Sequence, residues 1–171
     1  PMFAFTASKA AAGKTKAAQA ISQMWFGKNP ANVRYTSEEE ELSKILGSCA
    51  LAGDRMVLFD NVREGMPVRD PVLAGVLTSP DFDFRILGTN DRVKMSPVAT
   101  FFMTGIKLEF SEEIQRRVLQ IKIMPHRIPD GAPTPEAAAT RMRPQLISAA
   151  LTLIRGFYMA KRPKGHSDTL A

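Results

Sequence analysis

The chain has 171 residues, 44% of them hydrophobic, which is enough for one domain with a sizeable core. Its apolar runs are far shorter than the roughly 20 residues that a membrane-spanning helix needs, and no charged-then-apolar secretory leader opens it. With a single cysteine, Cys49, these features predict a cytoplasmic protein without an internal disulfide. The net charge of +6 makes anionic partners plausible without identifying them. Because Pro1 directly precedes an apolar run, we expect a piece of a longer protein.

Apolar segments with the length and composition of buried strands recur along the chain. They are found at 2–7, 33–36, 55–61, 98–105 and 116–123. The segment 82–95 alternates around the turn-forming sequence GTND and predicts a β-hairpin.

Helical segments separate these strands, and they are expected at 14–25, 37–52, 70–79 and from 144 onward. Ser37 with Glu40 three positions later forms a capping-box pattern that predicts the start of the second helix. The stretch 125–135 is a loop by composition. Pro144 is suited to the first turn of the last helix, in which several apolar residues share one face. These are Leu146, Ile147, Ala150, Leu151, Ile154, Phe157 and Tyr158.

Strands that alternate with helices predict an α/β fold of three layers, with a mainly parallel sheet, an inserted hairpin and a C-terminal helix. Ligands of such sheets bind at the carboxyl ends of the strands. In this chain those ends carry the loop at 8–15, Asp60 and Thr104, so we expect these three polar sites along one edge. We expect residues 1–125 to form the core and 126–171 to add a linker and a helical segment to the same domain.

The loop sequence SKAAAGKT is close to the phosphate-binding pattern G-x-x-x-x-G-K-[ST]. It places Ser8 where the first glycine belongs, so Ser8 and the alanines must adopt tolerant backbone angles or bear strain of about 1 kcal/mol. A lysine exposed at a helix start would explain the same letters without a ligand. The predicted phosphate-binding residues are Ser8, Ala12, Gly13, Lys14, Thr15 and Lys16.

Asp60 ends an apolar strand, the position from which a carboxylate holds Mg²⁺ in nucleotide-hydrolysing sites. With Thr15 it is the predicted metal ligand pair, and ATP with Mg²⁺ is the predicted cofactor; the less favoured alternative for Asp60 is a strand-end cap or turn residue. The next residue is Asn61, whose amide can position water but cannot accept a proton. Glu64 is the nearest acid that might substitute, and it also fits a solvated turn.

The ordered motifs AGKT, MVLFDN, RILG, TFFMTG and EIQRRVLQIKI resemble those of the ATPase domain of phage and mobile-element primase–helicase proteins. These are P-loop NTPases related to AAA+ and superfamily 3 helicases. The resemblance spans most of the chain and implies an AAA+-like fold, a Mg²⁺-dependent ATPase and a DNA replication motor. It also implies single-stranded DNA as a partner and assembly as a homo-oligomer, such as a hexameric ring.

The resemblance implies further site residues. In MTGIK, Ile106 and Lys107 replace two asparagines of the family's sensor, which leaves Thr104 as the nearest polar residue. Arg116 and Arg117 stand where the family has an arginine that reaches a neighbouring subunit's γ-phosphate, although a surface or intrachain ion pair would explain them too.

The hairpin lies where superfamily 3 helicases insert a DNA-contacting hairpin. Arg92 and Lys94 are therefore the predicted contacts to DNA phosphates, although a solvated hairpin would explain them as well. Arg85 matches a recurring family position without a derived role, and Arg143 is a candidate second nucleotide sensor.

Three hypotheses follow. The leading one is a catalytic ATPase motor that uses Lys14, Asp60, Asn61, Thr104 and an arginine from another subunit. The second is a degenerate nucleotide-binding or structural module, favoured by Ser8, Asn61 and the altered sensor. The third is a small-molecule kinase, for which no acceptor site is evident.

Overall fold

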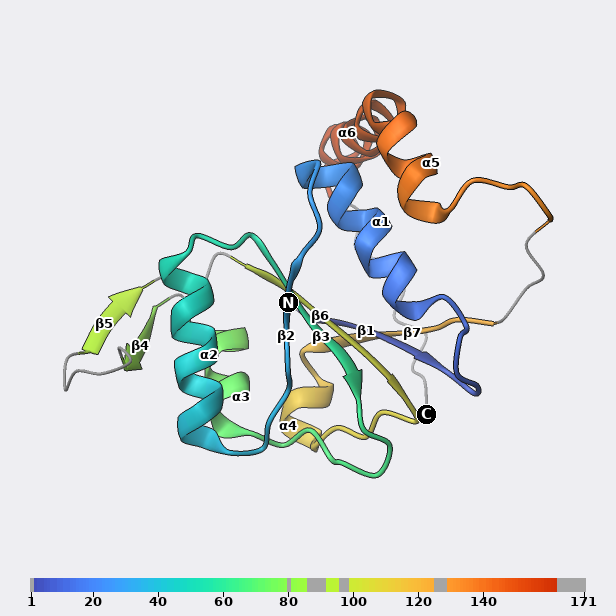
Figure 1. Cartoon of the computed structure of the whole chain (residues 1–171). Coiled ribbons are helices and arrows are strands. Elements are labelled where there is room, and N and C mark those ends of the chain that lie inside the picture. The colour runs from blue at the N-terminus through green and yellow to red at the C-terminus, as the bar shows by residue number, and fades with distance from the viewer. Residues whose placement is uncertain (1, 80, 86–91, 96–98, 125–128, 163–171) are drawn as a thin grey trace.

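The computed structural model describes residues 2–79, 81–85, 92–95, 99–124 and 129–162. Its main sheet is parallel and has the strand order β2-β3-β6-β1-β7. The strands are β1 (Met2–Ala7), β2 (Ala31–Val33), β3 (Met56–Val62), β6 (Thr100–Ile106) and β7 (Val118–Lys122). The prediction of an α/β fold with a mainly parallel sheet is confirmed for these residues (Figure 1).

Helices cover both faces of this sheet (Figure 1). The described helices are α1 (Lys14–Phe26), α2 (Glu39–Leu51), α3 (Pro71–Thr78), α4 (Glu112–Gln115), α5 (Pro135–Arg141) and α6 (Arg143–Met159), of which α6 does not lie on the sheet. Helices α2, α3 and α4 lie on one face, and α1 with α5 lies on the other.

Alternation along the strands supplies two separate hydrophobic clusters. In β3, Val57 and Phe59 face the α2–α3 side, whereas Met56 and Leu58 face α1. This is the period of two that a pleated strand imposes, and burial on both faces explains why the strand sequences are almost continuously apolar. Cys49 is buried in the α2–α3 cluster, as expected for a small residue on a buried helix face.

The entry to α2 differs from the prediction. The strand expected at 33–36 ends at Val33, and α2 begins at Glu39 rather than at a Ser37 cap. The Thr36 hydroxyl accepts the Glu38 backbone N–H at 3.1 Å in the turn before the helix, and α2 itself has no side-chain cap. Tyr35 does not pair with a strand. Its ring packs on the core edge-on against Phe59 and is buried there.

The predicted hairpin is confirmed in its strands, because β4 (Phe82–Arg85) and β5 (Arg92–Met95) pair antiparallel. The turn at 86–91 lies outside the described residues. Near β4, Gly75 of α3 makes room for the Phe82 ring: a Cβ there would lie 2.6 Å from that ring.

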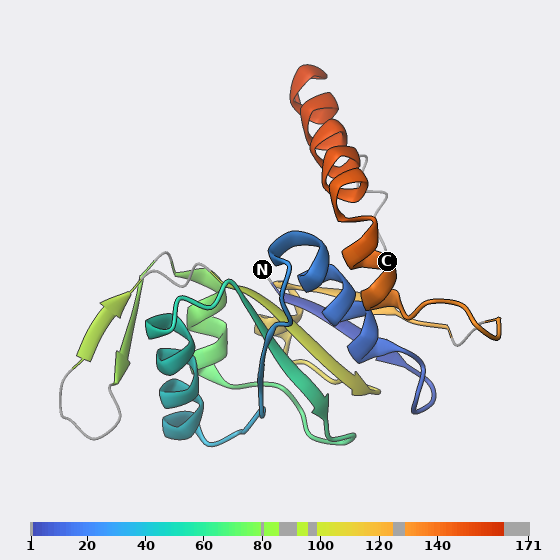
Figure 2. The same cartoon turned by 45° about the horizontal axis from the view of Figure 1, so that its top comes forward.

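Helix α5 was missed by the sequence analysis, although Thr134, Pro135 and Glu136 carry recognisable start signals. Thr134 accepts the Ala137 N–H at 3.3 Å, and Pro135 occupies the first turn. The helix expected from Pro144 begins at Arg143 and projects away from the sheet (Figure 2). None of its residues is buried: Leu146, Ile147 and Ala150 are half-buried, and the apolar side chains from Leu151 on are exposed.

No described helix has the length and apolar character needed to cross a membrane.

Candidate functional site at the carboxyl edge of the sheet

The loop between β1 and α1 accommodates its missing glycines with a single strained alanine. Ala11 has a φ of 55°, in the left-handed region, and Gly13 has a φ of 84° directly before the helix. Ser8 keeps a negative φ, so the position of the first glycine does not require one in this chain. Ala11 bears a cost of about 1–2 kcal/mol that a glycine would not bear.

Lys14 opens α1 and is 8% exposed, an unusual location for a cation. Its Nζ donates to the Lys9 carbonyl oxygen at 3.5 Å, so the loop folds back over the ammonium group. Within the described residues Lys14 has no carboxylate partner. A buried cation with one long hydrogen bond favours an anionic ligand, because burial without a counter-charge is costly.

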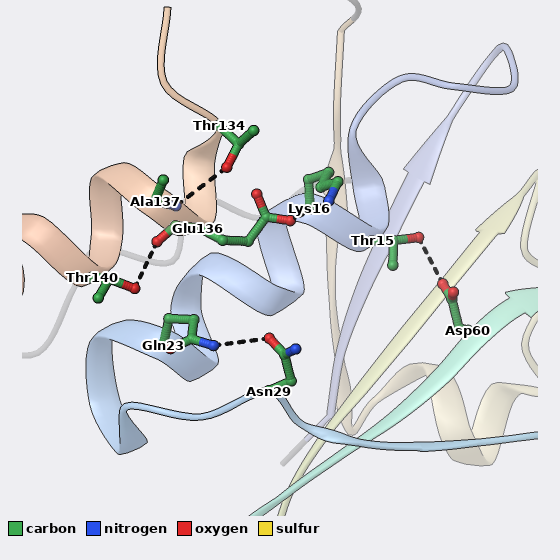
Figure 3. Close-up of polar contacts among 9 residues, drawn as sticks. All are labelled: Thr15, Lys16, Gln23, Asn29, Asp60, Thr134, Glu136, Ala137 and Thr140. Carbon is green, nitrogen blue, oxygen red and sulfur yellow. Dashed lines mark hydrogen bonds and ion pairs between the residues drawn. The ribbon is translucent and has the colours of Figure 1, made fainter.

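Asp60 is the point on which two threonine hydroxyls converge. Thr15 donates to Asp60 Oδ1 at 2.7 Å, across the gap between α1 and β3 (Figure 3). Thr104, 1% exposed on β6, donates to the same oxygen at 2.6 Å. The predicted meeting of the loop, Asp60 and Thr104 at one edge is therefore present, and the strand order explains it because β6 lies between β1 and β3.

A β-bulge sets the direction of Asp60. The β3–β6 register shifts between Phe59 and Val62, and Asn61 within this bulge has a φ of 55°. The Asn61 N–H donates to Thr104 Oγ1 at 2.8 Å, which ties the bulge to β6. Asparagine tolerates the left-handed region far better than glutamate does, so the backbone conformation supplies a reason for an asparagine at position 61.

The residues at Asp60 suit a magnesium ion. Mg²⁺ prefers oxygen ligands and needs only one or two carboxylates when substrate phosphates complete its shell. The Thr15 hydroxyl gives its proton to Asp60 and so keeps its lone pairs available for a cation. Among the described residues no group of three His, Cys, Asp or Glu side chains is arranged to hold a metal without such phosphates.

Lys16, a predicted phosphate-binding residue, points instead to α5. Its Nζ lies 2.6 Å from Glu136 Oε1, and Glu136 is largely buried between the helices (Figure 3). Burial acts to raise the pKa of Glu136, but hydrogen bonds from Lys16, its own backbone amide and Thr134 outweigh it and leave the pKa below its usual value. The second oxygen of Glu136 is buried without a hydrogen-bond partner among the described residues.

The two candidate arginines differ in what they contact. Arg117 Nε donates to Thr78 Oγ1 at 2.5 Å, its Nη1 donates to the Glu113 carbonyl oxygen, and Nη2 lies 3.8 Å from the Glu113 carboxylate. Contacts within its own chain therefore account for Arg117. Arg116 ends α4, is exposed, and has no side-chain partner within the described part of the chain.

Arg143 lies far from the loop, which corrects the expectation of a second nucleotide sensor. Its Nε donates to the Met24 carbonyl oxygen at 2.9 Å and its Nη2 to that of Trp25 at 3.2 Å. These carbonyls belong to the last turn of α1, at the opposite end from Lys14. Arg143 is thus a C-terminal cap that docks the start of α6 on α1.

The remaining predicted residues lie outside this cluster. The backbone of Arg92 and Lys94 is in β5 and that of Arg85 in β4, and their side chains lie outside what the structure describes. Glu64 forms an ion pair with Lys107 at 2.7 Å; the hydrogen bond and charge of Glu64 raise the Lys107 pKa.

Comparison with models of known protein families finds no match, and comparison with curated proteins finds none. Among solved structures, the chain is similar to JCV helicase, a viral protein crystallised with a thiazolopyridinyl-phenoxyphenyl acetamide bound, at a TM-score of 0.51 and 17% identity. The match covers 72% of this chain and 36% of that chain, so this chain spans about a third of the helicase's length. The likeness supports a helicase-like α/β fold.

Proposed function

We propose that this chain is the ATP-binding and hydrolysing motor domain of a DNA helicase or primase–helicase. The observation that carries the proposal is the convergence of Thr15 and Thr104 on Asp60, beside the buried Lys14, which has no ion-pair partner within the described residues. The fold shared with JCV helicase supports the same conclusion. The assignment to the P-loop and AAA+ proteins, the use of Mg²⁺ and the binding of DNA are all parts of this proposal.

In the proposed mechanism, the loop amides and the amino end of α1 bind the phosphates of ATP. Lys14 neutralises β- and γ-phosphate charge, and a triphosphate replaces its weak bond to the Lys9 carbonyl. Thr15 and Asp60 would hold Mg²⁺, which would supply positive charge to offset that of the reacting phosphate. Thr104 orients Asp60, and Asn61 positions the attacking water without accepting its proton.

Arg116 is the better candidate for an arginine that acts on a neighbouring subunit, because Arg117 is already engaged by Thr78 and Glu113. Such an arginine is worth about 10³–10⁵ in rate in phosphoryl transfer. Mixing Arg116→Ala subunits with Lys14→Ala subunits should restore part of the activity that each lacks alone. A verified mixed assembly without recovery would remove the shared site from the proposal.

A second candidate function is a nucleotide-binding module with little or no turnover. The left-handed Asn61 favours it, because that conformation disfavours the glutamate that would act as a base. The small-molecule kinase stays a prediction that nothing at the candidate site tests.

The decisive experiment measures ATP binding and hydrolysis with and without single-stranded DNA, on the longest natural chain. We expect hydrolysis that DNA stimulates, that EDTA abolishes and that Lys14→Ala removes. Lys9→Ala is the matched control, because the exposed Lys9 contributes only its carbonyl to the loop. Binding without turnover would select the module, and failure of the long chain to bind ATP would reject both functions.

A further inference from the structure

The distal end of α6, which projects away from the sheet (Figure 2), carries two exposed aromatic rings. Phe157 is 48% exposed and Tyr158 is 57% exposed, and their rings meet edge-on with centroids 6.1 Å apart. The guanidinium group of Arg162 lies over the Tyr158 ring, 4.5 Å from its centroid. We call these three side chains the α6 tip. Apolar rings that gather on an exposed surface mark an interaction site.

The backbone holds Arg162 over the ring at a conformational cost. Lys161 and Arg162 have φ values of 58° and 53°, in the left-handed region that residues with a side chain rarely adopt. The Lys161 N–H donates to the Tyr158 carbonyl oxygen at 3.0 Å. The Arg162 N–H donates to the Phe157 carbonyl oxygen, also at 3.0 Å. These two bonds are those of a Schellman motif, so α6 ends in a fixed turn that brings the arginine back onto the helix.

The charge of this segment favours a polyanion as its partner. From Ala137 to Arg162 the chain carries five cations and no acid. Three of these cations lie in the distal half of α6 or directly after it, and they are Arg155, Lys161 and Arg162. None of the three forms an ion pair within the described residues. A second copy of α6 would bring further cations and no acid, so it fits this surface less well than a polyanion does.

We infer that the α6 tip binds single-stranded DNA. Bases stack on the exposed rings and on the guanidinium plane of Arg162, while Arg155 and Lys161 contact phosphates. Stacking of this kind tolerates any base sequence because every base has a π-face, which suits a motor that moves along DNA. The inference takes its ligand from the proposed function, but it requires neither ATP binding nor hydrolysis.

The test measures the affinity of the longest natural chain for a fluorescein-labelled oligothymidylate by anisotropy, without nucleotide. Tyr158→Leu keeps an apolar side chain but removes the ring, and it should weaken binding about fivefold or more. Leu153→Ala is the matched control, because Leu153 is 76% exposed on the same helix and has no ring to stack. We expect this control to change affinity less than twofold.

The salt dependence of binding tests the cations. Arg162→Gln should reduce the slope of log affinity against log salt by about 0.7, because one phosphate contact is lost. Arg55→Gln removes the same charge from an exposed arginine beside β3 and should leave the slope unchanged. All of these side chains are exposed, so melting temperatures should stay at the wild-type value.

Fluorescence tests whether the strand reaches the tip itself. Tyr158→Trp should keep the wild-type affinity, and its emission should be quenched when the oligonucleotide stacks on the new ring. Wild type is the reference, because Trp25 is its one tryptophan and lies at the end of α1. Quenching no greater than in wild type would overturn the inference.

The other outcomes separate this inference from its alternatives. Equal affinity of wild type and Tyr158→Leu would overturn it. An equal loss in Leu153→Ala and Tyr158→Leu would overturn it too, because apolar contact along α6 would then be what binds. Failure to bind ATP would reject the proposed motor and leave the DNA measurements valid. DNA-stimulated hydrolysis that Tyr158→Leu leaves unchanged at every DNA concentration would reject the tip alone.

Discussion

Replacing Thr104 with valine tests the network that organises the candidate site. The side chain is 1% exposed, and valine keeps its shape while removing the hydroxyl. That hydroxyl donates to Asp60 at 2.6 Å and accepts the Asn61 N–H at 2.8 Å. A hydrogen bond to a charged group contributes about 1.5–3 kcal/mol, and leaving the partly buried Asn61 N–H without its partner adds at most about 1 kcal/mol. Because Asp60 keeps Thr15 as a partner and is partly solvated, we expect a total loss of about 2–4 kcal/mol.

The assay is urea denaturation of the two proteins, with the free energy of unfolding as the measured quantity. Thr100→Val is the control, because Thr100 lies on the same strand, is half-buried, and has no side-chain hydrogen bond among the described residues. We expect that control to change stability by less than about 0.5 kcal/mol. If Thr104→Val costs no more than Thr100→Val, the hydroxyl does not bridge Asp60 and the bulge, and the geometry of the site is wrong.

Three further predictions concern the loop and its neighbouring helices. Ala11→Gly relieves a left-handed alanine and should stabilise the fold by up to about 1 kcal/mol. Ala10→Gly, at a position with negative φ, should destabilise it. Thermal melts in which the two substitutions shift the melting temperature in the same direction would contradict the loop conformation. Because the folded pKa of Glu136 is lowered, its contribution is present above the unfolded pKa near 4.3 and lost as pH falls through the lower folded value. Urea midpoints should therefore fall less between pH 7 and pH 3 in Glu136→Gln than in wild type, and equal falls would argue against the Lys16 ion pair. Arg143→Gln removes two bonds to the last turn of α1 and should lower stability by about 1–2 kcal/mol, with faster amide exchange in that turn; unchanged exchange would exclude the cap.

Several elements were predictable because their signals are local. The apolar strands and the alanine-rich α1 carry patterns that neighbouring residues alone impose. The same holds for the β4–β5 hairpin. Helix α5 also had local signals, in Thr134 and Pro135, and the loop composition of 125–135 obscured them. The start of α2 at Glu39 did not follow from the spacing of Ser37 and Glu40, because the expected capping bond does not form and the helix has no side-chain cap.

The sequence predicted which edge of the sheet carries the site, but not how the side chains contact one another there. Parallel strands place their carboxyl ends together, so the meeting of Thr15, Asp60 and Thr104 followed from strand order. The bulge at Asn61 did not follow, because it depends on how β3 pairs with β6.

The sequence by itself determined the α/β class, the mainly parallel sheet and the polar residues at its edge, because periodicity and chain order decide these without distant contacts. Tertiary structure decided what each charged side chain contacts: Lys16 with Glu136 on α5, Arg143 at the end of α1, and Arg117 within its own chain. The physical reason is that a long side chain can reach many partners, and packing between distant segments selects one of them.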